Sequence, residues 1–460
     1  MRFFPYGSAT AALLAMSAPV LADNSPASST DILAQKFGHR EDIIDVSLSP
    51  DGQQVVYISP GDGQATFAIV SSVDGSHARP IARAAGDPLH LEACDWSSPH
   101  RVVCKQYGVA MRDNVLAPFT RTVAVDDDGT HIQPIGLRNN VDKLRISQFD
   151  GQIIDWLSGT DGTVLMTRDY VPDNTMAIGN FGSREDGIGV DLVDTVTGRG
   201  KRVEAPIHGN AHYLSDGRGA VRIMSSDRNS GSGDILSGVT RYSYRLTGEQ
   251  TWRPFSQTDA AGGNALIPIA VDGQANVAYA LRSLDGRDAL YRVALDGSMK
   301  TELVYANPNV DVRGVVTIGR DGRVIGASYT TDRRQIEYFD PQYRALARAL
   351  GKALPKLPLI YFLSASANER KLLIFAGSDV DPGHYYVFDR DTHHLDELTS
   401  ARPELEGLTL SPVRSITYPA ADGTNVPAYL TLPPGSSGQH LPAIVMPHGG
   451  PSARDEWGFD

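Results

Sequence analysis

The sequence predicts a mainly β fold whose larger part is an N-terminal β-propeller. Three observations carry this prediction: short runs of alternating apolar residues recur between residues 41 and 400, many of them meet at an Asp-Gly pair, and long helical patterns are nearly absent. The 460 residues include 45 Gly and 28 Pro, which favours many tight turns, and 41% of them are hydrophobic, enough for a packed core.

The repeated unit is a β-hairpin. It is clearest in residues 45–59, where alternating apolar residues flank Pro50-Asp51-Gly52. Glycine accepts the positive φ angle that such a turn requires, and the Asp side chain can close the same turn by a hydrogen bond. We expect further hairpins where the pair returns, at Asp128-Gly129, Asp161-Gly162, Asp216-Gly217, Asp272-Gly273, Asp296-Gly297 and Asp321-Gly322.

The number of blades follows from length. Residues 31–405 are too many for one β-sandwich; divided into seven units they give about 54 residues each, close to the roughly 40–50 of propeller repeats. Eight units would give about 47 each and also fit. We predict seven blades in residues 31–405, with eight as the alternative.

One segment has a helical pattern. Residues 340–350 begin with Asp340 as a candidate N-cap and Pro341 at the first helical position, and Leu346 and Leu350 are spaced to lie on one face. We expect a helix there.

The N-terminus resembles a signal peptide. Arg2 supplies a positive charge, residues 9–16 are apolar, and Val20-Leu21-Ala22 offers the small residues that a signal peptidase requires. We expect residues 1–22 to be a signal peptide cleaved after Ala22, and the mature protein to be exported, to a bacterial periplasm.

The two cysteines, Cys94 and Cys104, lie on neighbouring apolar runs separated by the turn-like Ser97-Ser98-Pro99-His100. A hairpin centred on that turn would place the two cysteines opposite each other, within reach of a disulfide that an oxidising compartment would preserve. Two reduced cysteines packed as small hydrophobic residues are the alternative.

The pattern of the sequence changes near residue 410. Three strand-like runs follow one another, at 415–418, 427–432 and 443–446, and His448-Gly449-Gly450 comes directly after the third. In α/β-hydrolases the loop after the third strand supplies a backbone N–H to the oxyanion hole, often from a His-Gly-Gly motif. Glycine suits this task because it has no Cβ to obstruct the oxyanion. His448, Gly449 and Gly450 are therefore candidate oxyanion-hole residues, and 406–460 is predicted to be the start of an incomplete α/β-hydrolase domain.

Residues 418–460 resemble the prolyl oligopeptidase family of serine peptidases, closest to its bacterial acylaminoacyl-peptidase-like branch. The motifs that carry this resemblance are Tyr429-Leu430-Thr431-Leu432-Pro433 and the run from His448 to Asp455, and Ser378–Tyr386 and Ser49–Gly52 look similar to the same branch. The resemblance implies a propeller that caps a catalytic domain and restricts it to short peptides. By position, Gly449 or Gly450 would donate the N–H to the oxyanion.

The sequence departs from this family in its catalytic triad. In α/β-hydrolases the nucleophilic Ser, the Asp and the His all follow the oxyanion loop, and Gly-x-Ser-x-Gly occurs nowhere in the 460 residues. The nearest strings, around Ser328 and Ser436, lack the second glycine or the spacing. We therefore expect no catalytic residue in this chain and no hydrolysis by it. Three origins would account for such a chain: a fragment of a longer peptidase, an interrupted gene, or a genuine short protein.

Other functional classes are less favoured. The formal charge of −12 argues against nucleic acid as a partner, and no apolar run is long enough to span a membrane. No metal site or cofactor is expected: the residues around His384, His393 and His394 match no metal-ligand spacing, and Asp126–Gly129 is a hairpin turn.

Arg184-Glu185-Asp186 and Arg333-Arg334 are expected to be exposed charges, although they could line the propeller tunnel. The alternative functions are a non-catalytic propeller that binds a peptide, protein or glycan, and a propeller glycosidase.

Overall fold

The computed structural model describes residues 29–112, 114–137, 143–157, 159, 161–174, 182–209, 211–229, 236–259, 264–450 and 453–460. The chain divides into two compact units, residues 1–39 and 40–460. The described part of the first unit forms helix α1 (Ser29–Gly38), with Asp31 in its first turn and Lys36 in its last, where each charge suits the helix dipole. The range predicted for the propeller thus opens with a helix. The predicted signal peptide, 1–22, lies outside the described residues.

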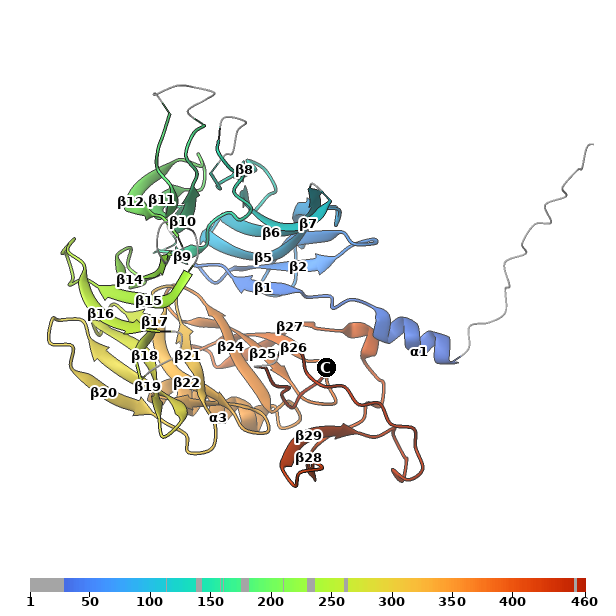
Figure 1. Cartoon of the computed structure of the whole chain (residues 1–460). Coiled ribbons are helices and arrows are strands. Elements are labelled where there is room, and N and C mark those ends of the chain that lie inside the picture. Colours follow the sequence, from blue (N-terminus) through green and yellow to red (C-terminus); the bar gives the residue numbers. More distant parts are fainter. Residues whose placement is uncertain are drawn as a thin grey trace, which may run out of the picture. The chain divides into compact units, whose positions relative to one another are not determined.

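The second unit contains a seven-bladed β-propeller, as predicted, followed by a separate two-stranded sheet (Figure 1). Six blades have four antiparallel strands and the sixth along the chain has three. The strands of blades one to four are β1 (Asp45–Leu48), β2 (Gln54–Pro60), β3 (Thr66–Ser72), β4 (Arg79–Ala84); β5 (Leu89–Ser98), β6 (Arg101–Arg112), β7 (Val115–Asp126), β8 (Gln133–Pro134); β9 (Ile153–Asp155), β10 (Thr163–Tyr170), β11 (Gly187–Asp194), β12 (Gly200–Ile207); and β13 (Ala211–Ser215), β14 (Val221–Asn229), β15 (Leu236–Tyr244), β16 (Arg253–Thr258).

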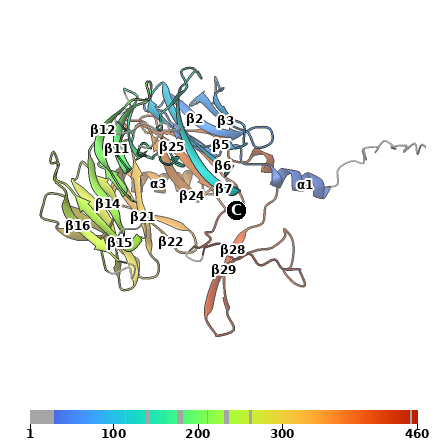
Figure 2. The ribbon, with the colours of Figure 1, turned by 45° about the horizontal axis from the view of Figure 1, so that its top comes forward.

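The strands of blades five to seven are β17 (Ile267–Asp272), β18 (Val277–Leu284), β19 (Arg287–Ala294), β20 (Thr301–Tyr305); β21 (Val312–Ile318), β22 (Arg323–Thr330), β23 (Arg334–Tyr338); and β24 (Leu359–Ala365), β25 (Lys371–Gly377), β26 (His384–Asp389), β27 (His394–Ser400). The first strands of most neighbouring blades contact one another, β5 of blade two contacts β10 of blade three, and β24 contacts β1, so the first strands line a central channel. Figure 2 shows the blades following one another in chain order.

Two faces of the propeller are distinguished by their turns. The turn face holds the turns between the first and second strands of each blade, and the hairpin face holds the turns between the second and third strands. Most of the predicted Asp-Gly pairs fall at turns of the turn face: Asp51-Gly52, Asp161-Gly162, Asp216-Gly217, Asp272-Gly273 and Asp321-Gly322. Asp128-Gly129 and Asp296-Gly297 join third to fourth strands. The Asp-Gly hairpins are confirmed. The five pairs between first and second strands lie close to the channel, because the first strands line it.

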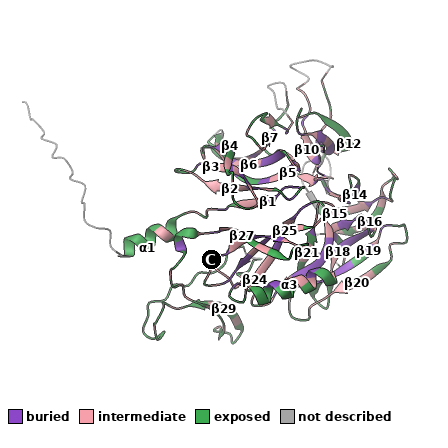
Figure 3. Ribbon diagram, turned by 180° about the vertical axis from the view of Figure 1, so that it is seen from behind, coloured by how far each residue is buried: buried purple, intermediate pink, exposed green. Residues whose placement is uncertain are grey.

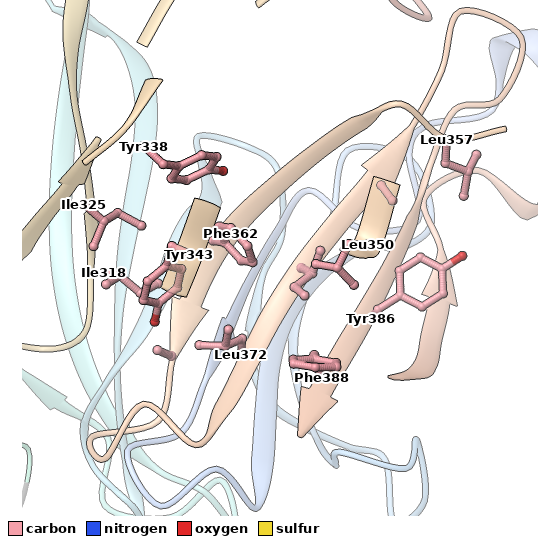
Figure 4. Close-up of a cluster of buried hydrophobic side chains, with 13 residues drawn as sticks. Ile318, Ile325, Tyr338, Tyr343, Leu350, Leu357, Phe362, Leu372, Tyr386 and Phe388 are labelled. Carbon is pink, nitrogen blue, oxygen red and sulfur yellow. The ribbon is translucent and has the colours of Figure 1, made fainter. Parts of the chain in front are cut away.

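The clusters of buried apolar side chains lie within and between blades. Figure 3 shows buried residues, in purple, along the strands of the blades. The predicted helix is confirmed as α3 (Pro341–Ala353), and Asp340 caps it by accepting hydrogen bonds from the N–H groups of Gln342 and Tyr343. Tyr343 and Leu350 of this helix are buried in the core of blades six and seven, beside Phe362 and Phe388 (Figure 4). The helix thereby covers blade six, which has only three strands.

The segment after the propeller forms two of its three predicted strands. β28 (Val413–Pro419) pairs with β29 (Asn425–Thr431) through a turn at Asp422-Gly423. The third prediction, a strand at 443–446, is wrong for this structure: the segment forms no strand, and Ile444, Val445 and Met446 are 89%, 84% and 80% exposed. A strand inside an α/β sheet needs neighbours on both sides and helices over both faces, and here residues 443–446 have no such neighbours.

Candidate functional site: the propeller channel and the C-terminal segment

The propeller channel contains a chamber of about 470 Å³ between blades one, two, three and seven. Its wall is formed by residues of the first strands β1, β5, β9 and β24, by residues that flank β9, and by residues of β6 and β7 in blade two. The lining residues with polar side chains are Asp45, Ser47, Asp95, Lys105, Thr122, Gln152 and Ser364. A chamber of this size with polar groups on its wall has room for a short peptide segment.

Two carboxylates of the chamber lie on neighbouring strands, Asp45 on β1 and Asp95 on β5. Burial raises the pKa of Asp45, and the nearby charge of Asp95 raises it further, although the N–H of Cys94 donates to its Oδ2 at 2.8 Å. Burial also raises the pKa of Asp95, against hydrogen bonds from Ser47 Oγ (2.6 Å) and the N–H of Trp96 (2.7 Å). The chamber therefore holds two carboxylates that protonate more readily than solvated ones.

The two cysteines sit in the wall of this chamber. Cys94 on β5 lies directly opposite Cys104 on β6, and their sulfur atoms are bonded, with 4.1 Å between the Cα atoms. Both are buried in the core of blades one and two. The bond joins the strand that carries Asp95 to its neighbour, so it braces the wall of the chamber.

The C-terminal segment is anchored on the hairpin face. Arg454 donates to the backbone carbonyls of Thr330 and Thr331, the second of which begins the β22–β23 turn. Glu456 pairs with Arg313 at 2.5 Å and accepts a hydrogen bond from the Thr330 hydroxyl at 2.9 Å.

The last residues make two further backbone contacts with blades six and seven. The N–H of Trp457 donates to Asp332, and the N–H of Phe459 donates to Ser378 at 3.0 Å. Arg333 stacks on the Trp457 ring, 4.7 Å from its centroid. Residues 454–460 thus bind to turns of the last two blades on the hairpin face.

The candidate oxyanion-hole residues, His448, Gly449 and Gly450, lie on an exposed loop that follows 443–446. Gly450 has a φ of 133°, which favours glycine, and a Cβ on Gly449 would meet no atom within 4 Å. His448 Nδ1 lies 2.8 Å from the carbonyl oxygen of Gly449. All three residues are exposed, and none of them lines the chamber.

The other candidate residues lie outside the chamber. Glu185 pairs with Arg202 and Asp186 with Arg145 at 3.2 Å, so this charged run belongs to an ion-pair network of blade three. Arg333 and Arg334 stack on Trp457 and Tyr361 rather than lining the channel. Ser328, in one of the strings nearest to a nucleophile motif, is 4% exposed inside blade six, where it is a core residue.

The histidines singled out in the sequence lie in blade seven. His384 is close to Glu397 (2.8 Å) and Asp381 (3.3 Å), and His394 to Asp396 (2.9 Å). Within the described parts of the chain, no group of three or more His, Cys, Asp or Glu side chains is arranged to hold a metal ion. No helix in those parts is long and apolar enough to cross a membrane.

The chain is similar in sequence and in fold to several known peptidases. No family model matches the chain. It is 25% identical to dipeptidyl aminopeptidase BIII of Pseudoxanthomonas mexicana, over 97% of this chain and 60% of that protein. Among solved structures, a puromycin-hydrolyzing peptidase of Mycobacterium tuberculosis has a TM-score of 0.53 at 16% identity, over 95% of this chain and 65% of that one. A prolyl endopeptidase has a TM-score of 0.52 at 12% identity, over 86% and 55%.

The resemblance to the prolyl oligopeptidase family is confirmed. At these identities the two solved structures show a shared fold. The chain spans about 60% of the length of the P. mexicana enzyme. The similarity to prolyl oligopeptidase family peptidases therefore covers nearly all of this chain and a part of its relatives.

Sequence reasoning missed two residues that the structure makes prominent, Trp457 and Arg320. Trp457 lies within residues 418–460, the segment that resembles the family, and that resemblance was the available signal for it. Arg320 precedes Asp321-Gly322 in a turn of blade six, and its contacts, described below, lie on distant blades. No local pattern marks such a residue, because its partners are backbone carbonyls far away in the sequence.

Proposed function

We propose that these residues are the propeller and the beginning of the catalytic domain of an exported serine peptidase that acts on short peptides. The observation that carries the proposal is the order of elements after blade seven: β28, β29 and then His448-Gly449-Gly450. Serine attack on a peptide carbonyl generates an oxyanion, and backbone N–H groups without a neighbouring Cβ can stabilise it. In this proposal Gly449 or Gly450 supplies one of those groups.

The similarity to dipeptidyl aminopeptidase BIII supports a peptidase, and the chamber supports short peptides as its substrates. The disulfide of Cys94 and Cys104 supports export, because such bonds persist mainly in oxidising compartments. A polypeptide made of these 460 residues contains no Gly-x-Ser-x-Gly, so we propose that on its own it has no peptidase turnover.

The test uses two samples and a fluorophosphonate probe that labels active serine hydrolases. The purified 460-residue polypeptide is expected to show no labelling and no release of nitroaniline from dipeptide nitroanilides. Antibodies raised against it are used to recover the native protein from its producing cells, and that protein is expected to be labelled. Labelling of the 460-residue polypeptide would contradict the missing nucleophile, and a native protein that stays unlabelled would favour a non-catalytic binding propeller.

A further inference from the structure

The side chain of Arg320 crosses the propeller channel. Arg320 lies in the blade-six turn on the turn face, between β21 and β22. Its Nη2 donates to the carbonyl oxygens of Trp96 in blade two (3.0 Å) and Trp156 in blade three (2.7 Å). In a ring of seven, blades two and three are the ones opposite blade six. The guanidinium therefore reaches from one side of the ring to the other.

The surroundings of the guanidinium are closely packed. Nε of Arg320 donates to the carbonyl of Leu157 at 3.2 Å, and a Cβ added to Gly159 would lie 2.5 Å from that Nε. The carboxylates of Asp95 and Asp155 attract the charge, while burial lowers the pKa of Arg320. Asp95 and Trp156 also line the chamber, so the guanidinium lies at the end of the chamber that faces the turn face.

The backbone beside Arg320 also contacts other blades near the channel. A Cβ on Gly217, in the blade-four turn, would lie 1.9 Å from the carbonyl oxygen of Asp321, so only glycine allows these turns to approach so closely. Arg218 Nη2 lies 3.6 Å from Asp321 Oδ2 at the rim. On the other side, a Cβ on Gly319 would lie 3.0 Å from Glu369 of blade seven. One turn thus touches blades two, three, four and seven.

We propose that Arg320 is a plug that closes the propeller channel at the turn face and makes the chamber closed-ended there. An arginine suits this role because its five donors can bind several backbone carbonyls at once and its charge persists at physiological pH. The consequence for substrates, which rests on the proposed function, is that peptides enter the chamber from the hairpin face, where the C-terminal segment is bound, and cannot thread through the propeller.

The plug can be tested without any peptidase activity. One cysteine replaces Gln274, an exposed residue of the blade-five turn on the turn face, and a second replaces Ser364, which lines the chamber. Cys94 and Cys104 are bonded to each other, so the new thiols are the reactive ones. A bismaleimide with a spacer of at most about 20 Å, the length of a six-residue strand, is too short to pass round the outside of a blade.

With Arg320 present, each thiol should react singly with N-ethylmaleimide, while the bismaleimide should give little intramolecular cross-link. Arg320→Ala should raise the cross-linking rate severalfold. Gly159→Ala should also raise the cross-linking rate, because its Cβ would displace the guanidinium from the blade-three side of the channel. Arg218→Ala is the matched control, since it removes a rim arginine that does not cross the channel, and it should leave the rate unchanged. Circular dichroism establishes that each variant is folded.

Equal cross-linking rates in the parent and in folded Arg320→Ala would overturn the plug, as would rapid cross-linking in the parent. If Arg320→Ala does not fold, Gly159→Ala provides the same comparison, and Arg320→Lys, which keeps the charge but loses the planar fork, gives an intermediate rate if the plug is real. Because no step requires turnover, a failure of the proposed peptidase activity leaves this result intact, and a failure of the plug leaves the proposed peptidase intact.

Discussion

The indole Nε1 of Trp457 donates a hydrogen bond to the backbone carbonyl of Val413 at 2.9 Å, which ties the last described residues to the start of β28. The N–H of Val413 in turn donates to Asp379 of blade seven at 2.8 Å. Two ends of the C-terminal segment, more than forty positions apart, are therefore held at one place on the hairpin face. The contacts of single residues in this segment can be removed one at a time by substitution.

Trp457 is expected to control how firmly the C-terminal segment is held. Trp457→Phe keeps a ring for Arg333 and loses one hydrogen bond, worth about 1 kcal/mol. Trp457→Ala loses the cation–π contact as well, about 0.5–1 kcal/mol more. Limited proteolysis followed by mass spectrometry should show faster cleavage within residues 413–460, in the order Ala, Phe, parent. Trp252→Phe is the control, because Trp252 stacks on Arg245 in blade four. Equal cleavage rates in all four proteins would refute the anchoring role.

The disulfide between Cys94 and Cys104 is expected to stabilise the propeller. It closes a loop with a sequence separation of 10, for which chain entropy gives about 2–3 kcal/mol. Urea unfolding of Cys94→Ala/Cys104→Ala should show a free energy of unfolding lower by about that amount. Dithiothreitol should lower the stability of the parent toward that of the double variant and leave the variant unchanged. A parent that is insensitive to the reductant while its thiols become titratable would contradict the prediction.

The buried carboxylate of Asp45 is expected to make the folded state less stable as pH rises. Its pKa in the folded protein is raised above the ordinary value of 3.8 by burial, so between the two values the folded state binds more protons than the unfolded state. The free energy of unfolding from this group therefore falls as pH increases through that window and is restored as pH decreases. Asp95 contributes in the same direction.

Asp45→Asn removes this titration and can still accept the N–H of Cys94. Urea unfolding of parent and variant at a series of pH values above 3.8 should give curves that separate as pH rises, with the variant more stable at neutral pH. Asp74→Asn is a matched control: the pKa of this fully exposed carboxyl is lowered, by hydrogen bonds from Ser76, so its removal should not produce that separation. Parallel curves for Asp45→Asn would refute the prediction.

Asp340 is expected to stabilise blade six by two separate contacts. Oδ1 caps helix α3, at 2.8 Å from the N–H of Gln342, and Oδ2 pairs with Arg323 at 2.7 Å. Asp340→Asn retains an oxygen for the cap and loses the charge, whereas Asp340→Ala loses both. Urea unfolding should show a loss of about 1–2 kcal/mol for Ala and a smaller loss for Asn. Equal losses in the two variants would mean that the ion pair and not the cap is responsible.

Much of the fold could be predicted because its signals are local. Asp-Gly turns flanked by alternating apolar residues specify hairpins through the conformation of a few neighbouring residues, and the total length then limits the number of blades. The cap of α3 and the opposition of Cys94 and Cys104 are local in the same sense, since Asp340 acts within its own first turn and the two cysteines lie on one hairpin.

The candidate site was less predictable because its contacts are between distant parts of the chain. Residues 443–446 have the composition of a strand, yet a strand forms only with neighbours to pair with, and the structure leaves them exposed. Likewise, His448-Gly449-Gly450 could be recognised as a motif from the sequence. The groups that would surround this motif come from distant segments of the chain, so the sequence alone does not identify them.

The sequence by itself determined the hairpins, the seven-blade length, the capped helix and the glycine loop, since each depends on residues close together in the chain. Tertiary structure alone decided that Asp45 and Asp95 share a chamber, that residues 454–460 bind the last blades, and that Arg320 spans the channel. The physical reason is that these contacts join residues of different blades, or of the C-terminal segment and a blade, so no local pattern specifies them. For Arg320, closure of the ring is what brings blade six opposite blades two and three.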